Sequence, residues 1–385
     1  MGRKITKVIG HQLFVARPSV WWPLMKKNQI DFKFWHKAFL ITLISALVWP
    51  LQKIQSIFYG KKIRSIDLNK NPPVFILGHW RSGTTHLHYI LHQDPQFGTL
   101  SNYQAFLFNL ALLSKTKLKW ILNPLMPPTR PQDNTAFDLY KPAEEEQPFS
   151  TMSSRSGIHS WNFPKNQNYF KKYNLFQGIS KKEKRAWQKS YVKCLQNISL
   201  FNDHKKLVLK NPHNTSRVKE LLELFPNAKF VYIHRKPEDV ILSTIHLYKK
   251  MVSSQYLQES EKIDQKKLIF ENYKNLLGKY EEERHLIPDG NLVELSYEDL
   301  SQNPKTTIKR LYRELGLLNF KTAWLHQDKY LNSVKRYKKN SYQKIDPALI
   351  EKIHNELHFE KLDRLCTDPR DLSNLEQKED LMAEV

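Results

Sequence analysis

The stretch Pro72–Leu87, PPVFILGHWRSGTTHL, decides the fold of this chain. Its four consecutive apolar residues, Val74–Leu77, are typical of a buried strand, and the run that follows is typical of a tight loop leading into a helix. Gly78 and Gly83 stand five positions apart, which is the glycine spacing of a P-loop. In such a loop, backbone N–H groups and the helix N-terminus bind an anion. The stretch therefore predicts a phosphate site after a buried strand.

The loop differs from that of a nucleotide triphosphatase at one informative position. A triphosphatase has Lys followed by Ser or Thr after the second glycine, whereas this chain has Thr84 and Thr85. The cation of the loop is Arg81 instead. The absent lysine argues against ATP chemistry and favours another phosphate-bearing donor. The predicted donor-binding residues of the loop are Arg81, Ser82, Gly83, Thr84 and Thr85.

A second segment, Lys229–His246 (KFVYIHRKPEDVILSTIH), repeats the pattern of an apolar strand that ends at a cation. Arg235 follows the strand, Pro237 suits a first helical turn, and Asp239 lies favourably near the positive end of the helix. Ser243 comes about two helical turns further on. The sequence therefore predicts that Arg235 and Ser243 hold one phosphate between a strand end and a helix face.

Together, the two segments resemble the sulfotransferases that use 3′-phosphoadenylyl sulfate (PAPS). The resemblance implies that the loop holds the 5′-phosphosulfate, and that Arg235 and Ser243, eight positions apart, hold the 3′-phosphate. Leu207–Phe230 looks like the strand, loop and helix that lead into the 3′-phosphate strand in this family. Val293–Pro304 looks like the later strand whose tyrosine, here Tyr297, packs near the adenine.

Two further segments extend the resemblance to most of the chain, roughly Pro72–Lys339. Arg130–Phe149 is similar to a segment of bacterial members of the carbohydrate-like sulfotransferase branch. Ser333–Lys339 resembles the late basic loop that folds over the 3′-phosphate side of the nucleotide, although the Arg-Lys-Gly form of the family is absent. This resemblance makes Lys335 and Arg336 candidate donor-binding residues.

Sulfuryl transfer builds negative charge on the bridging oxygen that leaves, and a fixed cation aimed at that oxygen stabilises the transition state. Lys210 stands at the end of the apolar run Leu207–Leu209 and before Asn211 and Pro212. A lysine in a similar context has this role in the related tyrosylprotein sulfotransferases, which implies the same role for Lys210. The neighbouring candidate strands end in basic residues rather than in an Asp that would hold Mg²⁺. We therefore expect metal-free transfer.

The general base is less clearly marked, because an acceptor hydroxyl needs a nearby group to take its proton. At the positions that match the base of related families, this chain has no carboxylate. It also has no Lys-Thr-His sequence. The acidic run Glu144–Glu146 is the best replacement, and helical spacing would direct only one or two of its side chains into a site. We predict Glu144 first and Glu146 second, with a solvated acidic surface as the alternative. Weaker candidates are His86, His88 and His213.

The composition limits the kinds of partner that the protein is expected to bind. The 385 residues carry a formal net charge of +23, which predicts anionic partners such as PAPS, an anionic acceptor or a membrane surface. The chain lacks zinc-finger spacing and an RRM signature, so we expect no nucleic acid. Cys194 and Cys366 are far apart and favour a reducing, cytoplasmic compartment without a metal site.

The most apolar segment is Ala38–Leu51, AFLITLISALVWPL. It is shorter than the roughly 20 residues that span a bilayer, and we expect Pro50 to end it. Aromatic and lysine residues precede the segment, as in a helix that lies on a membrane surface. The alternatives are a helix packed on the core of the domain, which we favour slightly, and peripheral attachment to the inner face of a membrane.

The expected fold class is α/β, with a P-loop-type parallel sheet flanked by helices. Strands are predicted at Val74–Leu77, around Phe97–Leu100, and at Leu207–Leu209, Phe230–Ile233 and Leu292–Leu295. An N-terminal helical region is expected over residues 1–70, a sulfotransferase domain over 71–345 and a C-terminal helical tail over 346–385. A helical insertion between Ala105 and Gln196 is expected to cover the acceptor pocket.

The predicted function is transfer of a sulfuryl group from PAPS to a hydroxyl or amine of a carbohydrate, lipid or other small molecule. One alternative is a P-loop kinase of a small molecule, against which Thr84 and the missing strand-end Asp argue. The other is a non-catalytic protein that binds a nucleotide or polyanion at a membrane surface. Donor binding without transfer to any acceptor would favour that last alternative.

Overall fold

The computed structural model describes residues 11–115, 117–122, 124, 129, 137–261, 263–335, 347–357 and 359–366. In this part of the chain, five strands form one sheet in the order β2-β3-β1-β4-β5, and every neighbouring pair is parallel. The strands are β1 (Val74–Leu77), β2 (Phe97–Gly98), β3 (Lys206–Lys210), β4 (Lys229–His234) and β5 (Leu292–Ser296). The predicted α/β class and the five predicted strand positions are confirmed.

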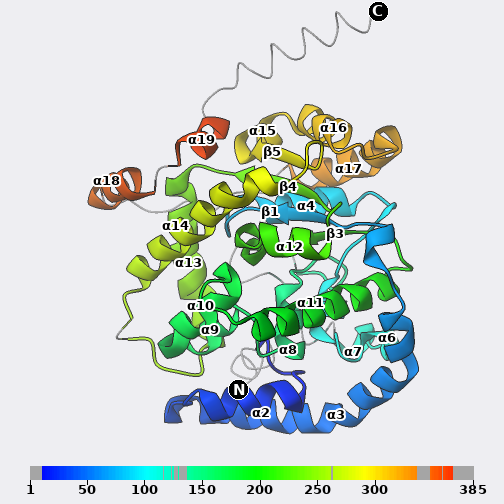
Figure 1. Cartoon of the computed structure of the whole chain (residues 1–385), viewed down its shortest axis with the longest axis vertical. Coiled ribbons are helices and arrows are strands. Elements are labelled where there is room, and N and C mark those ends of the chain that lie inside the picture. The colour runs from blue at the N-terminus through cyan, green and yellow to red at the C-terminus, as the bar shows by residue number, and fades with distance from the viewer. Residues whose placement is uncertain are drawn as a thin grey trace, which may run out of the picture.

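Helices cover both faces of the sheet (Figure 1). Successive strand residues point to opposite faces, so Val74 and Ile76 join one buried cluster while Phe75 and Leu77 join another. The first cluster is closed by α4 (Thr84–His92), α15 (Tyr297–Gln302), α16 (Pro304–Glu314) and α17 (Phe320–Val334). The second is closed by α11 (Lys181–Phe201), α12 (Val218–Leu224), α13 (Pro237–Lys250) and α14 (Gln265–Glu283). Burial on both faces explains why the strands are continuous apolar runs.

The remaining helices lie before and after this core. The N-terminal pair, α2 (Pro18–Lys27) and α3 (Trp35–Arg64), runs along the lower edge of the molecule in Figure 1. The segment between β2 and β3 is helical as predicted and contains α5 (Asn102–Phe106), α6 (Ala111–Ser114), α7 (Lys119–Leu122), α8 (Glu146–Met152), α9 (His159–Asn162) and α10 (Gln167–Leu175) before α11. The last elements are α18 (Pro347–Glu356) and α19 (Glu360–Asp363).

The strand register gathers the functional segments at one edge. Lys210 pairs with Ile76, and Tyr232 pairs with Leu77, so β3 and β4 end on either side of the P-loop. His234, directly before Arg235, pairs with Ser296 on β5. The carboxyl ends of parallel strands, where the chain leaves β1 between two neighbours, are the usual ligand site of such a sheet.

The expectation that Pro50 ends the apolar N-terminal segment is wrong. Pro50 lies inside α3, which continues to Arg64. Proline removes one helical hydrogen bond, but other contacts hold the helix on both sides of it. Ser45 Oγ donates to the Ala16 carbonyl at 2.7 Å, and Gln52 Nε2 donates to the Val15 carbonyl at 3.1 Å. These tertiary bonds keep the helix continuous through the proline.

Candidate active site

The two glycines of the loop are required by its backbone and by its neighbours. Gly78 has φ of 141° and Gly83 has φ of 100°, in the region that side chains disfavour. A Cβ atom on Gly83 would lie 2.3 Å from Cδ2 of Tyr297, and one on Gly78 would lie 2.6 Å from the Ile233 carbonyl oxygen. The glycines therefore let β4 and the tyrosine after β5 approach the loop.

Short hydrogen bonds fix the loop before any ligand enters. The Gly78 N–H donates to Thr215 Oγ1 at 2.7 Å, and this hydroxyl lies 3.1 Å from the Gly78 carbonyl oxygen that it donates to. Ser82 is buried, and its hydroxyl donates to the His79 carbonyl at 2.8 Å. Thr84 and Thr85 begin α4, so the N-terminal N–H groups of this nine-residue helix follow the loop directly. This arrangement suits an anion.

The two predicted phosphate segments meet at Arg81. Its Nε donates to Ser243 Oγ on α13 at 2.7 Å, and its carbonyl accepts a hydrogen bond from Arg235 Nη1 at 3.3 Å. The Arg235 guanidinium lies 4.6 Å from the ring centre of Tyr297. Arg81 has a positive φ of 74°, which is uncommon for a residue with a side chain and is concentrated at functional sites.

Arg235 and Ser243, which the sequence predicts to hold one phosphate, contact different side chains in this cluster. Ser243 contacts Arg81, whereas Arg235 forms an ion pair with Asp239, with Nη2 to Oδ2 at 2.9 Å. Asp239 is partly exposed, and ion pairs of this kind are weak. An incoming phosphate can therefore compete with Asp239 for Arg235.

The late basic segment is only partly described. Lys335 is exposed and follows α17 directly, while Arg336 lies outside the described residues. The ring of Tyr330, near the end of α17, lies 6.3 Å from that of His86 in the first turn of α4. The structure thus brings the end of α17 to the helix that follows the loop, and a role of Lys335 on the 3′-phosphate side stays a prediction.

The predicted catalytic pair meets at the end of β3. Lys210 is the last residue of the strand and is almost fully buried, and its ammonium forms an ion pair with Glu144. Glu144 is partly exposed and comes just before α8. The side chain predicted to stabilise the leaving oxygen therefore contacts the one predicted to take the acceptor proton.

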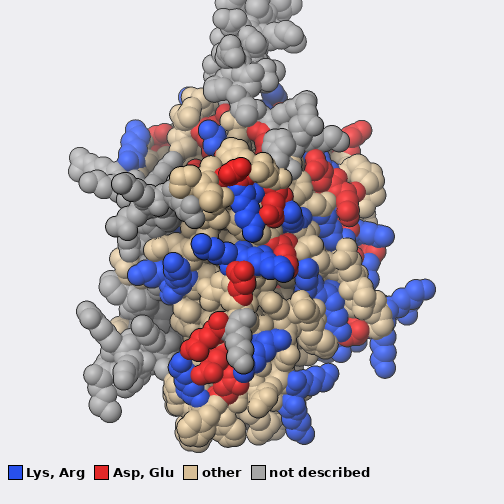
Figure 2. All heavy atoms as spheres, turned by 90° about the vertical axis from the view of Figure 1, so that its left-hand side faces the viewer, with Lys and Arg blue, Asp and Glu red and all other residues tan. Residues whose placement is uncertain are grey.

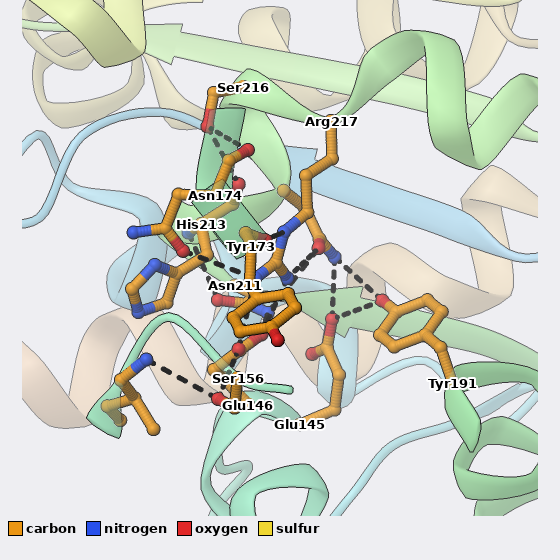
Figure 3. A network of polar contacts seen from close by, with 12 residues as sticks. Glu145, Glu146, Ser156, Tyr173, Asn174, Tyr191, Asn211, His213, Ser216 and Arg217 are labelled. Carbon is orange, nitrogen blue, oxygen red and sulfur yellow. Dashed lines mark hydrogen bonds and ion pairs between the residues drawn. The ribbon is translucent and has the colours of Figure 1, made fainter. Parts of the chain in front are cut away.

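Glu146 has a structural position instead. Arg217 binds its two oxygens with both guanidinium nitrogens, at 2.6 and 3.0 Å, and Ser156 and Asn211 donate to it at 2.6 and 2.8 Å (Figure 3). Burial alone would raise the pKa of Glu146, but the Arg217 guanidinium holds it well below its usual value. Both oxygens are occupied, so Glu146 is a buried structural anion rather than the second base that the sequence predicts.

Glu145, which the sequence reasoning passed over, is fully buried beside this pair. Its Oε1 accepts hydrogen bonds from the Tyr191 hydroxyl at 2.9 Å and from Asn214 Nδ2 at 2.7 Å (Figure 3). Burial raises the pKa of Glu145 to about 7. Its neighbours are more than 40 positions away in sequence, so no local pattern marks this residue.

The three histidine candidates lie in different surroundings. His88 is buried between α4 and β3, with Nε2 3.3 Å from the Val208 carbonyl oxygen. His86 is half-buried and faces α17 through Tyr330. His213 is buried three residues after Lys210, and neither of its ring nitrogens has a hydrogen-bond partner among the described residues. Burial lowers the pKa of His213 to about 4, so its imidazole is neutral at pH 7.

His213 and Trp80 of the loop line a pocket, and their rings meet edge-to-face at 4.8 Å. The inner wall is mainly apolar and buried, whereas polar side chains form the rim. The wall includes Trp161, Tyr248, Val252 and Leu276, and the rim includes Gln167, Asn168, Lys171, Glu271 and Asn275. Part of this lining falls in the predicted insertion and part comes from α13, α14 and the segment between them. The pocket opens beside the loop and can receive a molecule with an apolar body.

A model of the sulfotransferase family matches residues 72–321. Two proteins named omega-hydroxy-beta-dihydromenaquinone-9 sulfotransferase Stf3, from Mycobacterium bovis and Mycobacterium tuberculosis, are each 32% identical over 329 residues, which cover 84% of this chain and 84% of each relative. The match includes both phosphate segments and the end of β3.

Two crystal structures share the fold. Sulfotransferase STF1 from Mycobacterium tuberculosis H37Rv gives a TM-score of 0.59 at 18% identity, over 88% of this chain and 90% of that one. Sulfotransferase STF9 from Mycobacterium avium gives a TM-score of 0.61 at 16% identity, over 89% of this chain and 96% of that one.

Proposed function

Because this chain belongs to the sulfotransferase family and is an enzyme that transfers a sulfuryl group, we propose that its donor is PAPS and its acceptor is the hydroxyl of an apolar, lipid-like compound. The resemblance predicted from the two phosphate segments is thereby confirmed at the level of the family. Family membership argues against the kinase and the non-catalytic alternatives.

The contact between Arg81 and Ser243 is the observation that carries the donor assignment. It joins the loop that follows β1 to the helix that follows β4, so that two anion sites lie side by side. PAPS has phosphate groups at two separate positions. Arg81 supplies a cation for one of them, and Arg235 supplies a cation for the other. Tyr297, packed on Gly83 and Arg235, offers an aromatic face next to both sites. This combination suits a nucleotide phosphorylated at both the 3′ and 5′ positions.

The pocket behind Trp80 supports the acceptor class. Its buried lining is mainly aromatic and aliphatic, with His213 and Ser216 as buried polar groups, as in a site for a ligand with an apolar body and a polar end. The relatives from Mycobacterium are named for an acceptor with a terminal hydroxyl on a menaquinone. A hydroxyl at the end of an apolar chain fits both observations.

The proposed reaction forms a bond between the acceptor oxygen and sulfur and breaks the bond between sulfur and the bridging oxygen of PAPS. Lys210 stabilises the charge that develops on the bridging oxygen, and Glu144 takes the acceptor proton. Donor binding must therefore draw the Lys210 ammonium from Glu144 to the bridging oxygen. His213, neutral and facing the same pocket, is the alternative base.

Calorimetry with the full-length protein tests the donor. Adenosine 3′,5′-bisphosphate should bind at least tenfold more tightly than AMP, because a charged contact is worth about 1.5–3 kcal/mol. Ser243→Ala should reduce this preference, while the exposed control Lys205→Ala should keep it. Equal affinity of the wild-type protein for the two nucleotides would contradict the assignment.

Labelled PAPS tests the acceptor class. Sulfur-labelled PAPS should transfer its label to a long-chain isoprenoid alcohol and not to a soluble disaccharide. Labelling of the disaccharide alone would overturn the acceptor proposal and leave the donor proposal intact.

A further inference from the structure

Helix α3 presents a broad apolar face to the outside of the molecule. The exposed fractions of Phe39, Leu47, Ile57 and Phe58 are 66%, 67%, 76% and 69%. Further exposed apolar residues on the same helix are Trp35, Leu43, Trp49, Leu51 and Ile54. Soluble monomers rarely expose a contiguous apolar patch of this kind, and such a patch marks an interaction surface.

The middle of α3 packs on the protein through polar residues. Between Ser45 and Gln55 the buried side chains are Ser45, Gln52 and Gln55, whereas apolar Ala38, Ile41 and Ile63 are buried nearer the two ends of the helix. Gln55 donates to the Phe108 carbonyl at 3.3 Å and accepts from the Leu112 N–H at 2.9 Å, and Ser45 and Gln52 bond the N-terminal segment. A helix on the surface of a soluble protein buries its apolar side and exposes its polar side. The middle of α3 has the reverse arrangement.

These inward contacts distinguish a helix that lies on a bilayer from one that crosses it. Phe32–Arg64 is long and apolar enough to span a membrane. Spanning would remove Ser45, Gln52 and Gln55 from their partners and leave their polar groups in hydrocarbon, at a cost of several kcal/mol for each unsatisfied group. A helix that keeps this polar side on the protein can present only its outer side to lipid.

Charge indicates which surface α3 meets. Between Pro18 and Arg64 the chain has a single acidic residue, Asp31, which pairs with Lys165. The same segment has eight cations, namely Lys26, Lys27, Lys33, Lys37, Lys53, Lys61, Lys62 and Arg64. In Figure 2 the lowest tip of the molecule is mostly uncharged, with Lys and Arg on both sides of it and a group of Asp and Glu directly above. Two copies meeting through this face would oppose like charges, whereas an anionic bilayer complements them.

We propose that α3 docks the protein on an anionic lipid bilayer as a monotopic helix, with its apolar face at the boundary between headgroups and acyl chains. The ammonium of Lys53 lies 5.4 Å from the ring centre of Trp49, so a cation and an aromatic ring lie side by side on the exposed side. Tryptophan rings and long cationic side chains favour this boundary because each has an apolar body and a polar end. The proposal is independent of the donor and of the acceptor.

Co-sedimentation of the full-length protein with vesicles tests the docking. We expect binding to phosphatidylglycerol-containing vesicles and at least tenfold weaker binding to pure phosphatidylcholine. The triple variant Phe39→Ser, Leu47→Ser, Phe58→Ser should lose binding at least tenfold. A matched control, Leu286→Ser, Leu318→Ser, Leu325→Ser, removes exposed apolar side chains elsewhere and should bind as the wild-type protein does. Circular dichroism should show the same helix content for all three proteins.

Three results would overturn the proposal. The first is wild-type protein that stays in the supernatant with anionic vesicles. The second is a triple variant that binds as tightly as the wild type. The third is sedimentation equilibrium without lipid that shows a dimer in the wild type and a monomer in the triple variant, together with no vesicle binding, which would assign the face to a second copy of the chain.

Discussion

Lys210 and Glu144 form an ion pair at the end of β3. In the proposed reaction each charge gains a new partner, the lysine the bridging oxygen and the glutamate the acceptor hydroxyl. In that proposal the two groups of the ion pair would act on opposite sides of the sulfur atom.

Lys210→Ala should reduce turnover far more than donor binding. A hydrogen-bond donor aimed at the charge that develops in the transition state contributes about 3–4 kcal/mol to its stabilisation. This corresponds to a hundred- to thousandfold change in kcat. Affinity for adenosine 3′,5′-bisphosphate should stay within a few-fold, because that product lacks the sulfuryl group. Single-turnover rates and calorimetry on the same protein check both expectations. A loss of product affinity that matches the loss of rate would make Lys210 a binding residue only.

Glu144→Gln should lower kcat strongly and remove the acidic limb of the pH–rate profile, because the amide cannot take a proton. The measurement is kcat between pH 5 and 8 at saturating donor. His213→Ala is the companion variant. Full activity of Glu144→Gln together with an inactive His213→Ala would transfer the role of base to the histidine.

The carboxyl group of Glu145 should make the stability of the folded protein depend on pH. Its pKa in the folded protein, about 7, exceeds the ordinary value of 4.5. Its contribution to the free energy of unfolding is therefore complete below pH 4.5 and is lost as the pH rises through 7. The shift from 4.5 to about 7 corresponds to about 3 kcal/mol, at about 1.4 kcal/mol per pKa unit. Urea unfolding at pH 5 and pH 8 should therefore show a larger loss of stability in the wild type than in Glu145→Gln. Equal losses would show that Glu145 is not protonated in the folded protein at pH 5.

At the scale of elements, one buried ion pair joins α8 to the segment that follows β3. The Arg217 guanidinium donates to Glu146, to the Tyr173 carbonyl at 3.1 Å and to Asn174, and so ties three segments together. Glu144 comes two residues before Glu146, the first residue of α8, and Lys210 comes seven residues before Arg217. The ion pair of Glu146 with Arg217 thereby fixes the distance between Glu144 and Lys210, the two proposed catalytic side chains, without contacting the substrate.

Glu146→Gln should destabilise the protein by about 3–5 kcal/mol, because it leaves the Arg217 guanidinium buried without a counter-charge. The matched control is Glu223→Gln, which removes an exposed partner of Lys184 and should cost less than about 1 kcal/mol. Denaturant unfolding followed by circular dichroism gives both values. A cost for Glu146→Gln no greater than that of the control would mean that the buried pair does not hold the junction.

The elements were predictable to different degrees. β1 is a short apolar run that is followed by a glycine, and β3 and β4 are short apolar runs that end at basic residues, so local composition alone located these three strands. The junction of Glu146 with Arg217 joins positions 71 apart, and the Arg81–Ser243 contact joins positions 162 apart. Their partners are chosen by the fold rather than by neighbouring residues. The same limit explains why Glu145 was missed and why the contact between Arg81 and Ser243 was not predicted.

At the scale of the whole molecule, the chemistry and the exposed apolar face occupy different ends. The two predicted anion sites lie at the carboxyl edge of the sheet, whereas α3 runs along the lower edge of the molecule in Figure 1. The length of α3 was not predictable, because proline usually ends a helix and the bonds that carry it past Pro50 are tertiary.

The ammonium of Lys37, near the start of α3, donates hydrogen bonds to the carbonyls of Ser254 and Tyr256 at 2.8 and 3.1 Å, and Tyr256 lines the pocket. With α3 on a bilayer, this link would hold the reacting centre at a fixed distance from the lipid. An acceptor chain would then have to be long enough to bring its hydroxyl to that centre. A graded series of ω-hydroxy isoprenoids in vesicles should therefore show a threshold length for sulfation, whereas the same series in detergent-free solution should show none. Gradual length dependence in vesicles would mean that reach is not what selects the acceptor.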